Sequence, residues 1–198
     1  MIRRIWLLRH GKTEANEKRL YCGSTDLPLS PAGRAELEAL AAAGGYPHPA
    51  GLQYITSGLR RTAETLELLY GPVACSVCPE LREMDFGAFE MHSYAQLKDD
   101  AAYQAWITGD NEKNRCPGGE SGEEMRLRVL AGWKQVLARP EKELLLVLHG
   151  GPIAAIVEHL EPGLERNRWL HQPENGRGWL LTLEGDRLLK REPFPEGS

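Results

Sequence analysis

Two stretches of the chain share one form, in which an apolar run ends at a histidine followed by glycine: residues 5–11 read IWLLRHG and residues 144–151 read LLLVLHGG. Each apolar run is typical of a buried strand in a parallel sheet. The glycine allows a tight turn into a helix, whose free N–H groups and positive dipole end face an anion. We therefore expect His10 and His149 to lie at one edge of a sheet and to face one pocket.

The composition is that of one folded domain without an excess of positive charge. The chain has 198 residues, of which 41% are hydrophobic and 26% charged, and its formal net charge is -4 at pH 7. This length predicts a single domain over residues 1–198. The negative charge disfavours binding to nucleic acid or to an anionic membrane, so phosphate chemistry would need a local cluster of cations.

The apolar runs are too short to span a bilayer, and the first run is too short for a signal peptide. We therefore expect a cytoplasmic protein in which Cys22, Cys75, Cys78 and Cys116 are reduced thiols. Cys75 and Cys78 fall on a predicted strand, where side chains three positions apart face opposite ways, and no second pair completes a zinc site. No metal site and no cofactor are predicted.

Strands alternate with helices along most of the chain. Strands are expected at residues 2–8, 53–56, 73–77 and 144–148, with a terminal hairpin at 179–183 and 187–191. Helices are expected at residues 13–20, 30–43, 58–70, 93–107, 121–138 and 152–160. The alternation predicts an α/β fold, a three-layer α/β/α sandwich with a mainly parallel central sheet. A small helical cap is expected as an insertion at about residues 88–120.

Polar side chains at three predicted strand-to-helix turns point to phosphate chemistry. The turns contain Arg9 with His10, residues 57–61, and His149. Guanidinium groups bond phosphate oxygens in pairs, and a neutral imidazole is a nucleophile able to accept a phosphoryl group. Neighbouring positive charge disfavours imidazolium, so we expect Arg9 and Arg61 to keep His10 neutral.

A departing alkoxide needs a proton, and the loop at residues 81–87, LREMDFG, contains two carboxyl groups between apolar side chains that favour the protonated form. From the residues alone either Glu83 or Asp85 is the candidate acid, and both are also consistent with ordinary loop carboxylates. Similarly, Arg60 and Arg61 are consistent with a solvated helix face, and a single histidine is often structural.

Blocks of sequence with a familiar spacing occur in order along residues 2–151. They are LRHGKTEAN at 8–16, TSGLRRTAET at 56–65, LREMDFGAF at 81–89, PGGES at 117–121 and HGG at 149–151. Together they resemble the histidine phosphatase superfamily, the phosphoglycerate mutase-like proteins.

The resemblance implies that His10 is the phosphorylated nucleophile and that Glu83 is the proton donor. It implies that further residues bind the phosphoryl oxygens or line their pocket: Arg9, Asn16, Arg61, His149 and Gly150. It also selects Arg61 over Arg60, which falls on a variable position.

The segment between Glu83 and Pro117 is short compared with that of the cofactor-dependent mutases of this superfamily, and a more open cap favours hydrolysis. We therefore interpret the chain as a phosphatase that hydrolyses a small phosphorylated metabolite through a phosphohistidine. The alternatives are a cofactor-dependent phosphoglycerate mutase, a broad-specificity sugar-phosphate or nucleotide phosphatase and, from a different class, an inactive phosphate-binding module. No nucleic-acid or membrane partner is expected, and the sequence leaves a homodimer open.

Residues 20–30, LYCGSTDLPLS, look most like the α-ribazole phosphatases, which act in cobalamin assembly. This makes α-ribazole 5′-phosphate the candidate substrate and places Cys22 and Gly23 on the substrate side, although broad-specificity phosphatases share part of the block. The cap is expected to choose the substrate. Its aromatic residues Tyr94, Tyr103 and Trp106 either stack on a base or sugar or fill a small core, and core filling is favoured.

Overall fold

The computed structural model describes residues 1–110, 112–167 and 169–195 of the chain. A six-stranded sheet with strand order β3-β2-β4-β1-β5-β6 forms its centre. The strands are β1 (Ile2–Arg9), β2 (Gln53–Thr56), β3 (Cys75–Val77), β4 (Glu143–Leu148), β5 (Gly178–Glu184) and β6 (Arg187–Phe194). Every strand predicted from the sequence is present, and β3 is shorter than expected.

Parallel pairing dominates the half of the sheet that carries the His-Gly turns. β1 pairs with β4 in parallel, and β2 pairs in parallel with both β4 and β3. β5 is antiparallel to β1 and to β6, which forms the edge strand. The carboxyl ends of β1, β2 and β4 therefore meet at one edge of the sheet, where ligands bind in open α/β folds.

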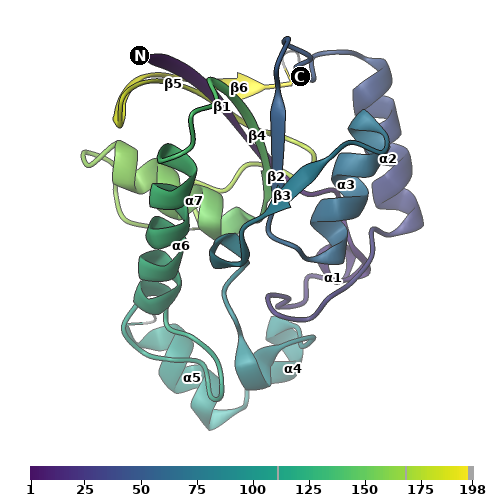
Figure 1. The fold of residues 1–198 in the computed structure, drawn as a ribbon. Helices are drawn as coiled ribbons and strands as arrows, with labels where there is room; N and C mark the ends of the chain where they lie inside the picture. Colours follow the sequence, from purple (N-terminus) through teal and green to yellow (C-terminus); the bar gives the residue numbers. More distant parts are fainter. Residues whose placement is uncertain (111, 168, 196–198) are drawn as a thin grey trace.

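Helices cover both faces of the sheet (Figure 1). On one face lie α2 (Pro31–Ala42) and α3 (Arg60–Tyr70), which pack against each other. On the other face lie α6 (Gly122–Leu137) and α7 (Gly150–Leu160), which also pack together. The predicted three-layer α/β/α sandwich with a mainly parallel sheet is confirmed.

The neighbouring strands β1 and β4 are apolar over residues 5–8 and 144–148, where both of their faces are covered. Leu7 of β1 packs into one core with Trp133 of α6, whereas its neighbour Leu8 packs into the other core with Leu66 of α3. Alternate side chains of a strand point to opposite faces, so a continuous apolar run is what a buried strand requires.

The cap contains two short helices where the sequence predicted one at residues 93–107. α4 (Tyr94–Leu97) and α5 (Ala101–Thr108) lie together at one end of the molecule (Figure 1). The break arises because the side chain of Asp100 accepts a hydrogen bond from the backbone N–H of Tyr103 and so begins a new helix. Tyr103 and Trp106 are buried and fill the cap core, which is the role that the sequence favoured for the cap aromatics. Tyr94, in contrast, is 59% exposed.

The helix predicted at residues 13–20 is a single turn, α1 (Glu14–Glu17). Arg19 lies two residues beyond the last residue of this helix, and its φ of 54° is in the left-handed region, so the right-handed helix cannot continue there. The chain then turns towards the loop of residues 20–30, which borders the site.

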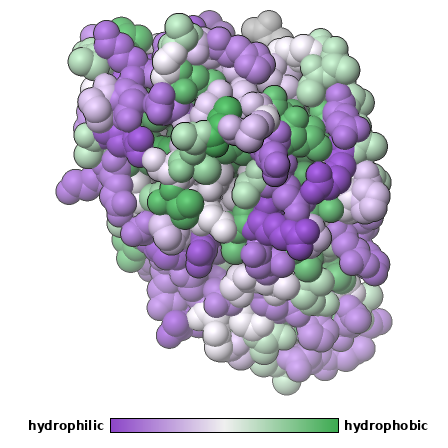
Figure 2. All heavy atoms as spheres, turned by 45° about the vertical axis from the view of Figure 1, so that its right-hand side comes forward, coloured by the Kyte–Doolittle hydropathy of each residue, from purple (hydrophilic) through white to green (hydrophobic). Residues whose placement is uncertain are grey.

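The surface is mostly hydrophilic on the face shown in Figure 2, where hydrophobic side chains are scattered in small groups. No helix among the described residues combines the length and the apolar character that crossing a bilayer requires.

Candidate active site

The two histidines of the His-Gly turns lie side by side at the carboxyl edge of the sheet. His10 follows β1 and His149 follows β4, and these strands are neighbours in parallel register. Their ring centroids are 5.1 Å apart, and both rings are buried. The repeated strand, histidine and glycine pattern thus brings together two residues that are far apart in the sequence.

One hydrogen bond fixes the tautomer of His10. Its Nδ1 lies 2.7 Å from the carbonyl oxygen of Gly11, and because a carbonyl only accepts, Nδ1 carries the hydrogen. Burial lowers the pKa of His10 well below its usual value, and the charges of Arg61 and Arg9 lower it further. The ring is therefore neutral, with the lone pair on Nε2, as a nucleophile requires.

His149 uses both ring nitrogens within the protein. The Nε of Arg61 donates to Nδ1 at 3.2 Å, so the hydrogen lies on Nε2, which donates to the hydroxyl of Ser57 at 2.7 Å. Burial lowers the pKa of His149 well below its usual value, and Arg61 adds to this shift. His149 therefore orients Arg61, and it can contact a phosphoryl oxygen directly only by exchanging one of these two bonds.

Arg61 is a buried cation whose side chain is held by neutral acceptors. It is 1% exposed, and its two terminal nitrogens donate to the carbonyl oxygens of Thr25 at 2.8 Å and Gly23 at 2.7 Å. With the bond to His149, three of its five N–H groups are used and two remain for a ligand. Arg60 instead pairs with Glu64 at the surface, so the structure separates the two arginines as the resemblance implied.

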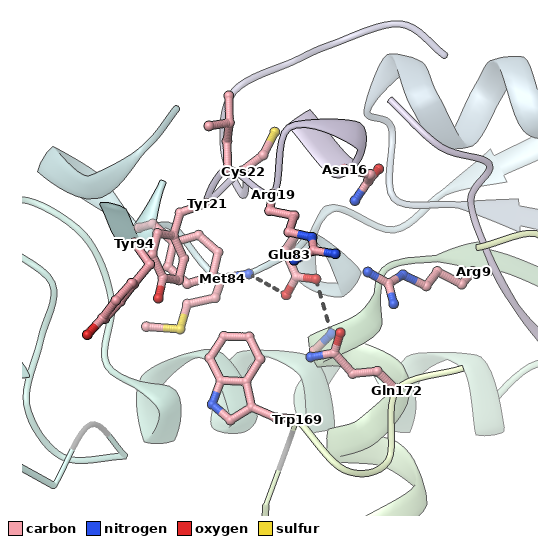
Figure 3. A pocket seen from close by; sticks show the side chains of 13 residues that line it. Arg9, Asn16, Arg19, Tyr21, Cys22, Glu83, Met84, Tyr94, Trp169 and Gln172 are labelled. Atoms are coloured by element: carbon pink, nitrogen blue, oxygen red, sulfur yellow. Dashed lines mark hydrogen bonds between the residues drawn. The ribbon is translucent and has the colours of Figure 1, made fainter. Parts of the chain in front are cut away.

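Arg9 and Asn16 present donors to the pocket drawn in Figure 3, whose lining includes Arg9 but not His10, Arg61 or His149. Arg9 donates to the carbonyl oxygen of Pro173 at 2.9 Å, and its buried Nε has no partner among the described residues. Burial lowers the pKa of Arg9, an effect that the charge of Glu83 opposes. The amide oxygen of Asn16 accepts from the N–H of Thr13 at 2.9 Å, which leaves the amide nitrogen for the pocket.

Of the two candidate acids, only Glu83 lies in the pocket. Its carboxylate accepts from the N–H of Gly151 at 3.1 Å, at the beginning of α7, and from the N–H of Met84 at 2.9 Å. Asp85 lies outside the pocket lining and accepts from the N–H of Gly87 at 2.9 Å within its own loop. Glu83, and not Asp85, therefore shares a pocket with Arg9 and Asn16.

The residue at position 151 must be glycine for Glu83 to approach the helix. A Cβ atom there would lie 2.3 Å from Oε1 of Glu83, far inside van der Waals contact. A Cβ atom at Gly150 would lie 2.1 Å from the side-chain oxygen of Gln172. The two glycines of the second turn therefore admit two polar side chains at the N-terminus of α7.

The pocket has a volume of about 260 Å³, near the lower end of small-molecule sites. Cys22 lines it, but Gly23 and Gly150 do not. The carbonyl oxygen of Gly23 accepts a hydrogen bond from Arg61, and the side chain of Gln172 lies close to Gly150. The lining residues are Arg9, Asn16, Arg19, Leu20, Tyr21, Cys22, Glu83, Met84, Phe86, Tyr94, Gly151, Trp169 and Gln172. Trp169 and Gln172 were missed in the sequence because they belong to a segment without periodicity or a recognised block.

The cysteines are free thiols, and Cys75 on β3 is exposed whereas Cys78 is buried. Burial raises the pKa of Cys22 to about 11, so it is a neutral wall residue rather than a reactive thiolate. Within the described part of the chain, no group of three histidine, cysteine or acidic side chains is placed to hold a metal ion.

Glu90 organises the loop that Arg61 contacts from the other side. Its carboxylate accepts from the backbone N–H groups of Gly23, Ser24, Thr25 and Phe86 at 2.9 to 3.3 Å. Glu90 was not singled out in the sequence because one acidic residue in an acidic loop carries no distinguishing pattern.

Glu120 and Arg128 form a second support, beneath the loop of Glu83. Arg128 on α6 donates to the carbonyl oxygens of Arg82 at 3.0 Å and Glu83 at 3.2 Å, and pairs with Glu120 at 2.6 Å. Glu120 in turn accepts from the N–H of Asp85 at 3.0 Å. The fourth block, residues 117–121, therefore contributes to the site by fixing the backbone on both sides of the acid.

Comparison with known proteins now identifies the family. A family model described as the histidine phosphatase superfamily (branch 1) matches residues 5–190. The chain belongs to the histidine phosphatase superfamily. It is similar to "Probable phosphoglycerate mutase GpmB" of Proteus mirabilis, with 31% identity over 203 residues and 92% of each chain covered.

Two solved structures share the fold of this histidine phosphatase superfamily member. A putative alpha-ribazole-5'-P phosphatase from Escherichia coli has a TM-score of 0.85 at 24% identity, covering 96% of this chain and 94% of that chain. The alpha-ribazole phosphatase from Shigella flexneri has a TM-score of 0.79 at 25% identity, covering 93% of each chain. The superfamily resemblance drawn from the sequence blocks is confirmed.

We expect His10 to remain neutral, with its hydrogen on Nδ1, at pH values where a free histidine side chain, with a pKa of about 6.5, is already protonated. A lowered pKa means that the ring takes up a proton only at lower pH. Two-bond 1H–15N correlation spectra between pH 5.5 and 7.5, assigned with His10→Gln, report the tautomer directly. In Arg9→Met the pKa should rise, and a wild-type ring that is charged at pH 6 would contradict the assignment.

Gly151→Ala should displace the Glu83 carboxylate and lower kcat/KM for a phosphomonoester by at least about tenfold, because a positioned acid contributes about 10² or more to such reactions. Thermal stability should change little, since alanine is favoured over glycine in a helix. The matched control is Gly163→Ala, where the added Cβ meets no atom within 4 Å. Unchanged kinetics in Gly151→Ala would show that the position of Glu83 is not needed.

Proposed function

We propose that this chain is a phosphomonoesterase that hydrolyses a small phosphorylated metabolite through a phosphohistidine on His10, without a metal ion. The observation that carries the proposal is a neutral His10 with Nε2 free, near the buried cation Arg61 and the half-buried cation Arg9. Such a site offers a nucleophile and positive charge to the same dianion.

The first half of the reaction forms the phosphoenzyme. Nε2 of His10 attacks phosphorus, the bond between phosphorus and the ester oxygen breaks, and Glu83 gives its proton to the departing alcohol. In the second half, water attacks the phosphohistidine and loses a proton to the carboxylate of Glu83. The bond between phosphorus and nitrogen breaks, inorganic phosphate leaves, and both residues return to their starting forms.

The remaining polar groups stabilise charge on the transferring phosphoryl. Arg9 and Arg61 each keep N–H groups that the hydrogen bonds described above do not use, and Asn16 lines the pocket that Arg9 also lines. Because these donors are fixed before substrate arrives, they act without reorganisation in the transition state. His149 supports this set by orienting Arg61.

Hydrolysis is favoured over phosphoryl return to a bound product by the exposure of the pocket wall. Tyr94 is 59% exposed and Trp169 is 46% exposed, although both line the pocket, so water can reach the phosphohistidine. The solved structures named as α-ribazole phosphatases and the sequence of residues 20–30 support α-ribazole 5′-phosphate as the substrate. The relative named as a probable phosphoglycerate mutase makes 3-phosphoglycerate the comparison to test.

The purified protein should release phosphate from p-nitrophenyl phosphate and α-ribazole 5′-phosphate between pH 5 and 8 in the presence of a chelator. His10→Ala should lose turnover and the acid-labile phosphoenzyme seen by labelling, because the attacking nitrogen is gone. With 3-phosphoglycerate, 31P spectra should show free phosphate rather than 2-phosphoglycerate. Labelling that persists in His10→Ala, or a requirement for metal, would overturn the mechanism, and binding without turnover would indicate an inactive module.

Glu83→Gln should slow phosphoryl transfer from an alkyl phosphate by roughly 10² to 10⁴, because the poor leaving group needs a proton. The first turnover of p-nitrophenyl phosphate, whose leaving group needs none, should be much less affected and appear as a burst of p-nitrophenol. Stopped-flow measurement of both substrates tests this. Asp85→Asn is the matched control and should keep the wild-type ratio of the two rates; equal losses for both esters in Glu83→Gln would rule out the acid role.

A further inference from the structure

The active-site pocket has two chemically different ends (Figure 3). Arg9, Asn16 and Gln172 surround one end, with Glu83 between the ends. The other end is bordered by the aromatic and thioether side chains of Tyr21, Met84, Tyr94 and Trp169, and Phe86 packs against Tyr21 there. A ligand whose phosphate lies at the charged end therefore places the rest of its structure against the aromatic end.

Two of the aromatic side chains are held at the surface despite their size. Tyr94 is 59% exposed and Trp169 is 46% exposed, and both border this pocket. They come from different segments, since Tyr94 begins α4 of the cap and Trp169 follows α7. Large apolar groups that converge on a polar site from separate elements are typical of ligand-binding walls.

The side chain of Tyr94, on the cap side of the pocket, packs against the aromatic core of the cap. The ring of Tyr94 packs edge-on against Tyr103 with centroids 6.1 Å apart, and Tyr103 is fully buried. The hydroxyl of Tyr103 is 2.7 Å from that of Tyr21, whose ring packs on Phe86 at 5.1 Å. A wall fixed in this way offers a flat face without the entropy cost of ordering flexible side chains.

We propose that Tyr94 and Trp169 form an aromatic subsite that binds a flat unsaturated ring in the alcohol part of the substrate and so determines specificity. The inference rests on the proposed phosphomonoesterase function and goes further by naming the residues that select the alcohol part of the substrate. Aromatic side chains stack on heterocyclic rings regardless of the ring's hydrogen-bonding groups. The subsite therefore favours phosphate esters of nucleoside-like alcohols.

The same wall is a poor match for an acyclic phosphorylated acid. A carboxylate placed among Tyr21, Tyr94 and Trp169 would lose hydration without gaining a cation. Arg19 is the further cation in the pocket lining, and in Figure 3 its side chain points away from Tyr94 and Trp169. Ring-bearing and acyclic substrates are thus separated by the aromatic end rather than by the phosphate contacts.

Adenosine 5′-monophosphate and ribose 5-phosphate test the subsite, because they share the phosphate and the sugar and differ in the ring. We expect kcat/KM to be roughly 5- to 100-fold higher for the nucleotide, the range that one stacked base provides. Trp169→Ala and Tyr94→Ala should each reduce this preference, because KM rises more for the nucleotide than for ribose 5-phosphate. Leu170→Ala is the matched control, since Leu170 adjoins Trp169, is 62% exposed and does not border the pocket.

A binding measurement tests the aromatic subsite independently of phosphatase activity. Titration calorimetry of His10→Ala, which cannot form the phosphoenzyme, should show tighter binding of adenosine 5′-monophosphate than of ribose 5-phosphate. Binding with this preference but no turnover by the wild type would contradict the phosphomonoesterase and retain the subsite. Equal affinity for both ligands, or equal losses for both in Trp169→Ala and Tyr94→Ala, would overturn the subsite whether or not the protein hydrolyses them.

Discussion

The site depends on one positive charge, that of Arg61, buried without a carboxylate partner among the described residues. Its guanidinium is held by the carbonyl oxygens of Gly23 and Thr25 and by His149. Burying a cation without an anion is costly, so the arrangement favours the arrival of a dianion. The same charge contributes, after burial itself, to keeping His10 and His149 neutral. Arg61 thus links the neutral state of His10, the positive charge of the candidate site and the geometry of the loop that contains Gly23 and Thr25.

A local rule explains why much of this site could be predicted from the sequence. Side chains that follow parallel strands meet at the carboxyl edge, so Arg9, His10 and His149 were placed together once the two apolar runs were taken as strands. The family blocks then selected Arg61, which contacts His149, and Glu83, which contacts the first turn of α7. Arg9, His10 and His149 were predictable from the strand ends, whereas Arg61 on α3 and Glu83 in a loop were selected only by the resemblance.

Other parts of the site and of the cap depend on contacts that cannot be predicted from a local sequence pattern. Trp169 reaches the pocket from an irregular segment, and Glu90 acts through backbone N–H groups of a loop distant in sequence. The cap helix was expected to be continuous because its composition is helical, yet Asp100 begins a new helix within it. In each case the decisive partner is a backbone group or a tertiary neighbour, which periodicity does not record.

The contacts that hold the backbone around Glu83 lie outside the two cap helices. Its backbone is fixed by Arg128 on α6 and, through Asp85, by Glu120, all outside the cap helices α4 and α5. The cap returns to the body at residues 117–121, so its length and sequence upstream of that point do not enter the support of the acid. In the proposed mechanism, a change in the cap helices would therefore alter the alcohols accepted while the geometry of proton transfer stays the same.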